Sequence, residues 1–327
     1  MEPILHSKAA ELGLTPGHLR TARYEHPVSG VSVLSAEAGD LTTVCAAITL
    51  VLPDDAVFTH LTSARLRGWW LPAIIDEPII ACTSGEAPHL DRRGVYVRRC
   101  NLPTGHRTIF RGLPLASPEW TIVELAENLR LIDLVVVIDC ALHLRHTTVD
   151  RIRATMRRGR RGVRVLRQAL TLVDGRSDSP WETVLRLAHT LSGIRVEPQH
   201  QLRDEIGNII WSLDMLITGT RRAAEFDGGV HRTAEVHQRD MKRDRLLSRH
   251  GIERYAYGAQ DIRDDPAQIV HDAEEALGVA RIPGRSRWWL EEFEQSSFHP
   301  QGYGRLKRRL KRFARTSPPR QRPPSGA

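Results

Sequence analysis

Two acidic residues are spaced so that they would meet across a β-hairpin. Asp214 lies in the strand-like segment 209–217 and Glu225 in the strand-like segment 221–227. A two-residue turn beginning at Gly219 would place Asp214 directly across from Glu225, with Cβ atoms roughly 4.5–5.5 Å apart. Side chains at paired positions share one face of a sheet, so this hairpin would bring two carboxylates together.

Asp227 adds a third carboxylate to that face, because side chains two residues apart in a strand point the same way. Like charges on neighbouring strands repel, and a hard divalent cation with oxygen ligands would offset the repulsion. We therefore expect Mg²⁺ or Mn²⁺ here, activating water for hydrolysis of a phosphodiester bond. The alternative is that Asp214 and Glu225 face solvent and pair with arginines such as Arg221 and Arg222.

Glu182 and His231 could complete such a site. Glu182 stands three residues after Ser179, which is the spacing of a helix capping box, and capping explains both residues without catalysis. The same carboxylate could also reach the metal ion, directly or through water. His231 follows the hairpin and could act as general base or bind the scissile phosphate, although a loop histidine more often has no such role.

Arginines predicted to contact nucleic acid lie in two segments. In the helix expected over 233–249, Arg239 and Arg243 could bind phosphate or form ion pairs within the helix. Residues 148–170 are dense in arginine, with no acidic residue between 151 and 167. Binding of a DNA duplex requires such a basic strip, although part of the run must be solvated surface. The residues assigned to this strip are Arg157, Arg158, Arg160 and Arg161.

The elements that must position these side chains follow the order αβββαβα within residues 179–280. A helix begins at Ser179-Pro180 and runs to about residue 191. The expected fold class is therefore mixed α/β. Strands are expected at 195–202, 209–217, 221–227 and 252–257, and later helices at 233–249 and 266–277.

The rest of the chain divides into four predicted segments. They are a winged-helix-like segment (1–38), a small α+β domain (39–147), an arginine-rich helical connector and linker (148–178), and a basic, partly disordered tail (281–327). In the first segment, helices at 4–13 and 16–23 would precede a β wing, and a helical hairpin that caps the next domain is the alternative. In the second, strands are expected at 79–84 and 94–100.

Charge and composition set further expectations. The net charge is +8, but residues 305–327 hold nine Lys or Arg and no Asp or Glu, which leaves 38 basic against 39 acidic residues elsewhere. Such a tail either contacts a polyanion or is a solvated end. No apolar run approaches the roughly 18 residues that span a bilayer, and no signal-peptide pattern is present, so a cytoplasmic location is expected. The four cysteines form no CxxC pair and are expected to be buried rather than to bind zinc.

The acidic hairpin and its surroundings resemble a known family. The motifs SPWETVLRLA (179–188), GNIIWSLDMLI (207–217), AAEFDGGVHR (223–232), RDMKRDRLL (239–247) and GIERYAY (251–257) are similar, in this order, to the Vsr-like family of unknown function, within the PD-(D/E)XK or restriction-endonuclease-like superfamily. At the position where the superfamily has a lysine that orients or activates the water, this chain has Asp227. The resemblance therefore does not identify the general base, and His231 is assigned to that role because it lies close by in the sequence. The positions it implies are Glu182, Asp214, Glu225, Asp227, Gly228, His231, Arg239, Asp240 and Arg243.

Two earlier motifs resemble a second group of proteins. FTHLTSARLRGWWLP (58–72) and GLPLASPEWTIVELA (112–126) are similar to the amino-terminal part of actinobacterial proteins related to AbiEi-type antitoxins, in which a winged helix and a small α/β domain precede the Vsr-like unit. The usual arginine-threonine of the second motif is Trp120-Thr121 here. The resemblance implies a DNA partner and leaves any toxin partner unidentified.

These expectations lead to one main hypothesis and two alternatives. The main hypothesis is a metal-dependent DNA endonuclease or nickase acting on double-stranded DNA, with Asp214 and Glu225 as primary metal ligands, Glu182 and Asp227 in support, and His231 as base or phosphate ligand. The first alternative is a non-catalytic DNA-binding regulator resembling a type IV antitoxin, with the nuclease-like unit as a scaffold. The second is an interaction protein whose arginine run and tail bind RNA or acidic partners.

Overall fold

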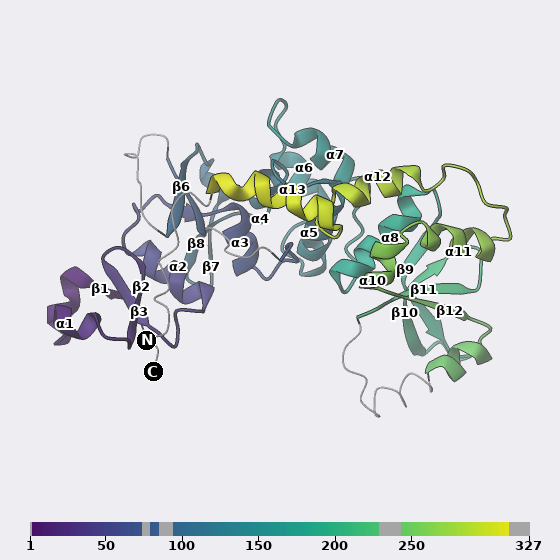
Figure 1. Ribbon diagram of the computed structural model, residues 1–327, viewed down its shortest axis with the longest axis horizontal. Coiled ribbons are helices and arrows are strands. Elements are labelled where there is room, and N and C mark those ends of the chain that lie inside the picture. The colour runs from purple at the N-terminus through teal and green to yellow at the C-terminus, as the bar shows by residue number, and fades with distance from the viewer. Residues whose placement is uncertain (1, 74–78, 85–93, 229–242, 314–327) are drawn as a thin grey trace. The chain divides into compact units, whose positions relative to one another are not determined.

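A computed structural model describes residues 2–73, 79–84, 94–228 and 243–313 (Figure 1). The chain forms two compact units. The predicted boundary near residue 178 lies inside the second unit, and the described residues 306–313 belong to the first. The first unit comprises residues 1–128, 150–163 and 306–327, and the second comprises residues 129–149 and 164–305.

The N-terminal part of the first unit is a three-stranded antiparallel sheet in the order β1-β3-β2. β2 (Tyr24–Val28) and β3 (Val31–Leu34) form the predicted wing. The predicted helix over 4–13 is wrong at its start, because Ile4 and Leu5 pair with β3 as strand β1 (Ile4–Leu5) and Ile4 is buried there. Helical backbone is confined to the 3-10 helix η1 (His6–Leu12) and to α1 (Pro16–Leu19).

A five-stranded sheet in the order β6-β5-β4-β8-β7 forms the centre of the first unit. Its strands are β4 (Val57–Phe58), β5 (Ile79–Thr83), β6 (Val95–Arg99), β7 (Arg107–Phe110) and β8 (Leu113–Ala116). Only β5 and β6 were predicted, since strands of two to four residues are too short to show a period. Three helices of this unit are α2 (Leu41–Thr49), α3 (His60–Leu66) and α4 (Pro118–Leu125).

The segment beyond residue 281 is more ordered than the predicted tail. It contains α12 (Arg287–Gln295), α13 (Pro300–Leu310) and a 3-10 turn, η3 (Lys311–Phe313). Leu306, Leu310 and Phe313 have the spacing of one helix face and are almost fully buried, so they form an apolar stripe that packs into protein. Residues 314–327 lie outside the described part of the chain.

The second unit is built on a four-stranded mixed sheet in the order β12-β11-β10-β9. α8 (Pro180–Leu191) packs against β9 and β11, and also contacts α5 (Leu131–His143), α11 and α12. Ser179 caps α8 and Pro180 stands at its first turn, as the sequence predicted. The strands are β9 (Val196–Arg203), β10 (Ile209–Ile217), β11 (Arg222–Asp227) and β12 (Glu253–Gly258). Further helices of this unit are α7 (Val163–Ala169), α10 (Ala259–Asp264) and α11 (Gln268–Ala276). Helix α6 (Val149–Thr155) belongs to the first unit from Asp150 onward.

Within residues 179–280 the described elements follow the predicted order αβββαβα, with α10 as an unpredicted addition, and residues 233–242 of the predicted helix over 233–249 lie outside the described part of the chain. β11 and β12 run parallel, which requires a crossover between them. Within that crossover the described residues 243–249 are helical. No helix in the described residues has the length and hydrophobicity that a membrane span requires.

Candidate functional site

The register of the central hairpin agrees with the sequence prediction. Met215 pairs with Ala224 and Leu216 with Ala223, so the next pair along the ladder is Asp214 with Glu225. Gly219 has a φ of +83°, as a glycine at this turn should. The apolar stripe of β10 is buried at Leu213, Met215 and Ile217, whereas Ile209 at its start is exposed.

A third side chain extends this row across the sheet. The β9–β10 register pairs Leu213 with His200 and Met215 with Pro198, which sets Gln199 across from Asp214 on the other side. Gln199 has a φ of +52°, a conformation that side-chain-bearing residues rarely adopt. Its amide donates a hydrogen bond of 3.1 Å to Glu182 of α8. The sheet and α8 therefore bring Glu182, Asp214 and Glu225 into one neighbourhood.

Asp214 is held by the backbone of the neighbouring strand. The Phe226 N–H donates to Asp214 Oδ2 at 2.8 Å. Burial raises the pKa of the Asp214 carboxyl above its ordinary value, while the Phe226 hydrogen bond and the charge of Arg243 oppose that rise. The ionised form of Asp214 is thus disfavoured by burial and only partly compensated.

The Glu182 carboxylate accepts hydrogen bonds from two groups, and neither is the Ser179 N–H that a capping box would use. The backbone N–H of Glu182 donates to Ser179 Oγ, so Ser179 caps the helix as predicted. The Glu182 carboxylate does not return to the Ser179 N–H and instead accepts from the Asp178 N–H at 2.8 Å and from Gln199. Burial raises the pKa of Glu182, and the charge of Asp214 adds to the rise.

Glu225 is the most enclosed member of the row, with 1% of its surface exposed. Its Oε2 accepts hydrogen bonds from Arg243 Nη2 and from Arg254 Nε, both of which also form ion pairs with it. Its Oε1 is buried and has no hydrogen-bond partner among the described residues. Arg243 also lies over the ring of Trp211, 5.2 Å from its centroid. Two guanidinium groups therefore supply countercharge to this carboxylate.

The fit of a metal ion to these residues is incomplete. In the described part of the chain, no three His, Cys, Asp or Glu side chains are grouped so that they could hold an ion. Glu225 Oε1 has unused acceptor capacity, but its other oxygen is shared by two arginines. Asp227 lies exposed at the end of β11. His231, Arg239 and Asp240 lie outside the described residues.

Two residues of this neighbourhood were not found from the sequence. Gln199 bridges β9 to Glu182, and Arg254 of β12 binds Glu225. The motif around Arg254 was noted, but the strand order was needed to show that β12 lies next to β11. Gln199 gave no signal, since a glutamine in a strand is most often a surface residue.

The arginine-dense segment adopts a fixed loop between α6 and α7. Gly162 has a φ of +81°, and a Cβ at that position would lie only 2.2 Å from the Ala126 carbonyl oxygen. Arg160 donates to Glu127 at 3.3 Å and its guanidinium lies 4.5 Å from the centroid of the Trp120 ring. These contacts attach the loop to the end of α4, so Arg160, assigned above to nucleic-acid binding, makes internal contacts.

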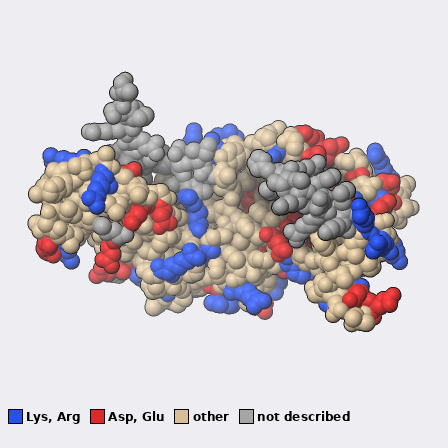
Figure 2. All heavy atoms as spheres, turned by 90° about the horizontal axis from the view of Figure 1, so that it is seen from below, with Lys and Arg blue, Asp and Glu red and all other residues tan. Residues whose placement is uncertain are grey.

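The other three assigned arginines of this loop are exposed. Arg157, Arg158 and Arg161 have no carboxylate partner among the residues that the structure describes. We call these three side chains the arginine loop. On the face shown in Figure 2, Lys and Arg side chains lie among Asp and Glu rather than in one continuous patch. The three side chains of the arginine loop therefore concentrate positive charge locally, on a surface whose charges are otherwise mixed.

Comparison with known proteins gives a match in the middle of the chain. A family model described as the AbiEi antitoxin C-terminal domain matches residues 73–175. The matched region includes α4 and the arginine loop, beyond the end of the predicted α+β domain at residue 147. The chain is similar to this antitoxin family over those residues.

Two curated relatives are uncharacterized proteins from two strains of Mycobacterium tuberculosis. Each is 28% identical over 172 residues, covering 51% of this chain and 63% of the relative. The matched part of the chain thus spans less than two thirds of these relatives. No solved structure matches the chain.

Proposed function

We propose that this chain is a DNA-binding regulator similar to type IV antitoxins, with its second unit serving as a non-catalytic scaffold. The observation that carries the proposal is the arginine loop: three exposed guanidinium groups, with no carboxylate partner in the described part of the chain, on a loop whose backbone is anchored by Gly162 and Arg160. Guanidinium groups bind phosphate oxygens, and an anchored loop loses little conformational entropy when it does so. The antitoxin family match covers this loop.

The contacts of Glu225 support the scaffold role. A buried carboxylate bound by Arg243 and Arg254 has its charge compensated within the protein. Removing either partner would leave buried charge uncompensated, so these residues contribute to folding whether or not the site has chemistry. We infer that the second unit has a restriction-endonuclease-like topology, which its mixed sheet and its element order support.

Duplex binding measured over a salt series tests the proposal. Fluorescence anisotropy with a labelled duplex should show affinity that falls steeply with KCl and needs no divalent cation. Each phosphate contact contributes about 0.9 to the slope of log K against log salt. The triple variant Arg157→Gln, Arg158→Gln, Arg161→Gln should therefore lower the slope by up to about 2.7.

A matched triple variant separates this contact from a general charge effect. Arg195, Arg249 and Arg281 are exposed arginines of the second unit, and changing all three to Gln removes the same net charge. The proposal requires that this control retain most of the slope. Equal losses in the two triple variants, or binding with no salt dependence, would overturn it.

A metal-dependent DNA endonuclease or nickase is the second candidate, and one observation favours it. Glu225 Oε1 is buried and has no hydrogen-bond partner in the described part of the chain, and Asp214 and Glu182 of the same neighbourhood have pKa values raised mainly by burial. These carboxylate oxygens would favour binding of a cation if a further ligand completed the site, either the His231 imidazole or one more carboxylate. Plasmid cleavage with Mg²⁺ or Mn²⁺ that Asp214→Asn abolishes would favour this candidate over the scaffold.

A further inference from the structure

A cavity of about 550 Å³ opens in the N-terminal part of the first unit, between the helical segment η1–α1 and the β2–β3 hairpin. Its volume is in the range of sites that hold small organic ligands. Ala9, Leu19 and Val28 are buried and provide an apolar floor. None of the described residues that line the cavity is acidic.

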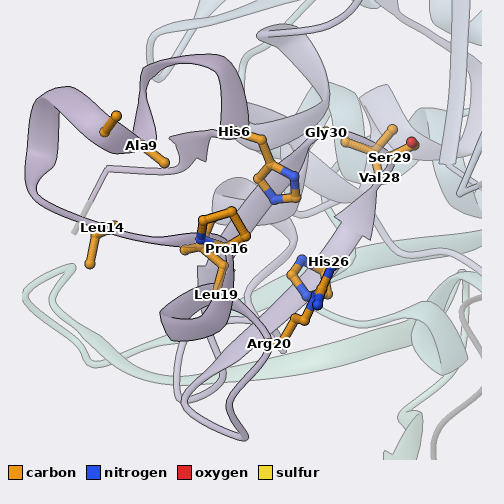
Figure 3. Close-up of a pocket in the computed structure, with 11 residues that line it drawn as sticks. His6, Ala9, Leu14, Pro16, Leu19, Arg20, His26, Val28, Ser29 and Gly30 are labelled. Atoms are coloured by element: carbon orange, nitrogen blue, oxygen red, sulfur yellow. The ribbon is translucent and has the colours of Figure 1, made fainter.

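Three nitrogen-bearing side chains stand at this cavity: His6, Arg20 and His26 (Figure 3). They come from η1, from the end of α1 and from β2, so the fold and not sequence proximity brings them together. All three are exposed, and all three line the same cavity. The cavity therefore combines an apolar floor with a cationic or protonatable rim.

A buried hydroxyl fixes the two imidazoles. Ser32 of β3 is fully buried, and its Oγ lies 2.8 Å from His6 Nε2 and 2.9 Å from His26 Nδ1. The two ring centroids are 5.5 Å apart and the rings are nearly perpendicular. Because Ser32 engages one nitrogen of each ring, the other nitrogens, His6 Nδ1 and His26 Nε2, remain for a ligand.

The electrostatics of the rim favour an anion. Burial lowers the pKa of His6, and repulsion from His26 lowers it further. An anion placed between the rings and Arg20 would relieve that repulsion and accept charge-assisted hydrogen bonds. Its apolar portion would cover Ala9 and Leu19.

We propose that this cavity binds a small organic anion, namely a carboxylate that carries an aliphatic body. The carboxylate binds Arg20 and His26, and the aliphatic body fills the floor between η1 and β2. A nucleic-acid phosphate lacks an apolar body to occupy that floor, which is why a small amphipathic anion fits better than DNA. This site is separate from the arginine loop and does not depend on the DNA-binding proposal.

Calorimetric titration of the full chain with octanoate tests the proposal. One octanoate should bind per chain, and 1-octanol should bind at least about tenfold more weakly, because it lacks the charge that Arg20 recognises. Arg20→Gln should weaken octanoate binding by about tenfold. Arg23→Gln is the matched control, since Arg23 is an exposed arginine of the same segment that does not line the cavity.

A variant that fills the cavity provides a second test of the proposal in case Arg20→Gln perturbs folding. Ala10 lines the cavity and is itself exposed, so Ala10→Phe should occupy the space and abolish binding without unfolding the chain. The proposal is overturned if octanoate and 1-octanol bind equally, or if Arg20→Gln and Arg23→Gln have the same effect. It is also overturned if only a DNA duplex, and not octanoate, is weakened by Arg20→Gln.

Discussion

Asp214 lies directly across from Glu225 in the β10–β11 pair, and the two carboxylates differ in what holds them. Asp214 accepts a backbone N–H, whereas Glu225 is bound by two guanidinium groups. The two carboxylates that were expected to bind one cation as equivalent ligands therefore have different hydrogen-bond partners in this fold. This asymmetry gives the first two predictions.

Loss of one of the two arginines that bind Glu225 should destabilise the second unit. Arg254→Met leaves the buried carboxylate with Arg243 alone, and the loss of a charged, buried hydrogen bond should cost about 2 kcal/mol of unfolding free energy. Urea unfolding of the full chain measures this cost. Arg245→Met, which changes an exposed arginine of the neighbouring helix, should cost less than about 0.5 kcal/mol. Equal costs would show that the Glu225 contact has no energetic role.

Divalent metal should have little effect on a scaffold. Calorimetric titration with Mn²⁺ should show no saturable binding that depends on Asp214, so the natural chain and Asp214→Asn should give the same heats. Affinity for a DNA duplex should be the same with and without a chelator. The physical reason is that Arg243 and Arg254 already compensate Glu225. Saturable Mn²⁺ binding in the natural chain, lost in Asp214→Asn, would contradict the scaffold role and support the nuclease candidate.

Glu124 should make stability depend on pH near neutrality. Burial raises the pKa of Glu124 from 4.5 to about 7, although Arg98 lies 3.4 Å away. Between these pH values the folded chain keeps a proton that the unfolded chain has released, so stability falls as pH rises from about 4.5 to about 7. In the natural chain the urea midpoint of unfolding should be higher at pH 5 than at pH 8, and the difference between the two midpoints should shrink in Glu124→Gln. The exposed Glu205→Gln should leave the natural pH dependence intact.

Two glycines of the arginine-rich segment have the same backbone conformation and different surroundings. Gly159 has a φ of +82° with open space around it, whereas a Cβ on Gly162 would overlap the Ala126 carbonyl. Gly159→Ala should therefore cost about 1 kcal/mol, and Gly162→Ala should cost more and shift the loop. Thermal unfolding measures stability, and the salt slope of duplex binding should fall only in Gly162→Ala. The same slope in both variants would argue against an anchored loop.

Phe313 should contribute strongly to the first unit. Its ring lies 5.1 Å from those of both His60 and Tyr96 and is almost fully buried. Phe313→Ala should cost about 3–5 kcal/mol, as expected for loss of a buried aromatic side chain. Trp288→Ala serves as the control, because Trp288 is 41% exposed. A loss below about 1 kcal/mol for Phe313→Ala would mean that the C-terminal segment is a solvated end.

The long, periodic elements were predictable from local sequence. The α8 cap at Ser179, strand β10 and the hairpin register around Gly219 all follow from residue spacing, because a turn of fixed length determines which residues face each other. Short strands such as β4 have too few residues to show a period. The two residues of β1 carry no strand pattern of their own, because they are defined by pairing with β3, whose residues lie 26 to 28 positions further along the chain.

The sequence by itself determined which acidic residues meet, since Asp214 and Glu225 are joined by a local hairpin whose turn fixes their pairing. Only the tertiary structure decided what surrounds them. Arg254 reaches Glu225 because β12 lies beside β11 after a crossover, and Gln199 reaches Glu182 because α8 packs over β9. Such contacts depend on strand order and packing between distant segments, which residue spacing along the chain does not encode.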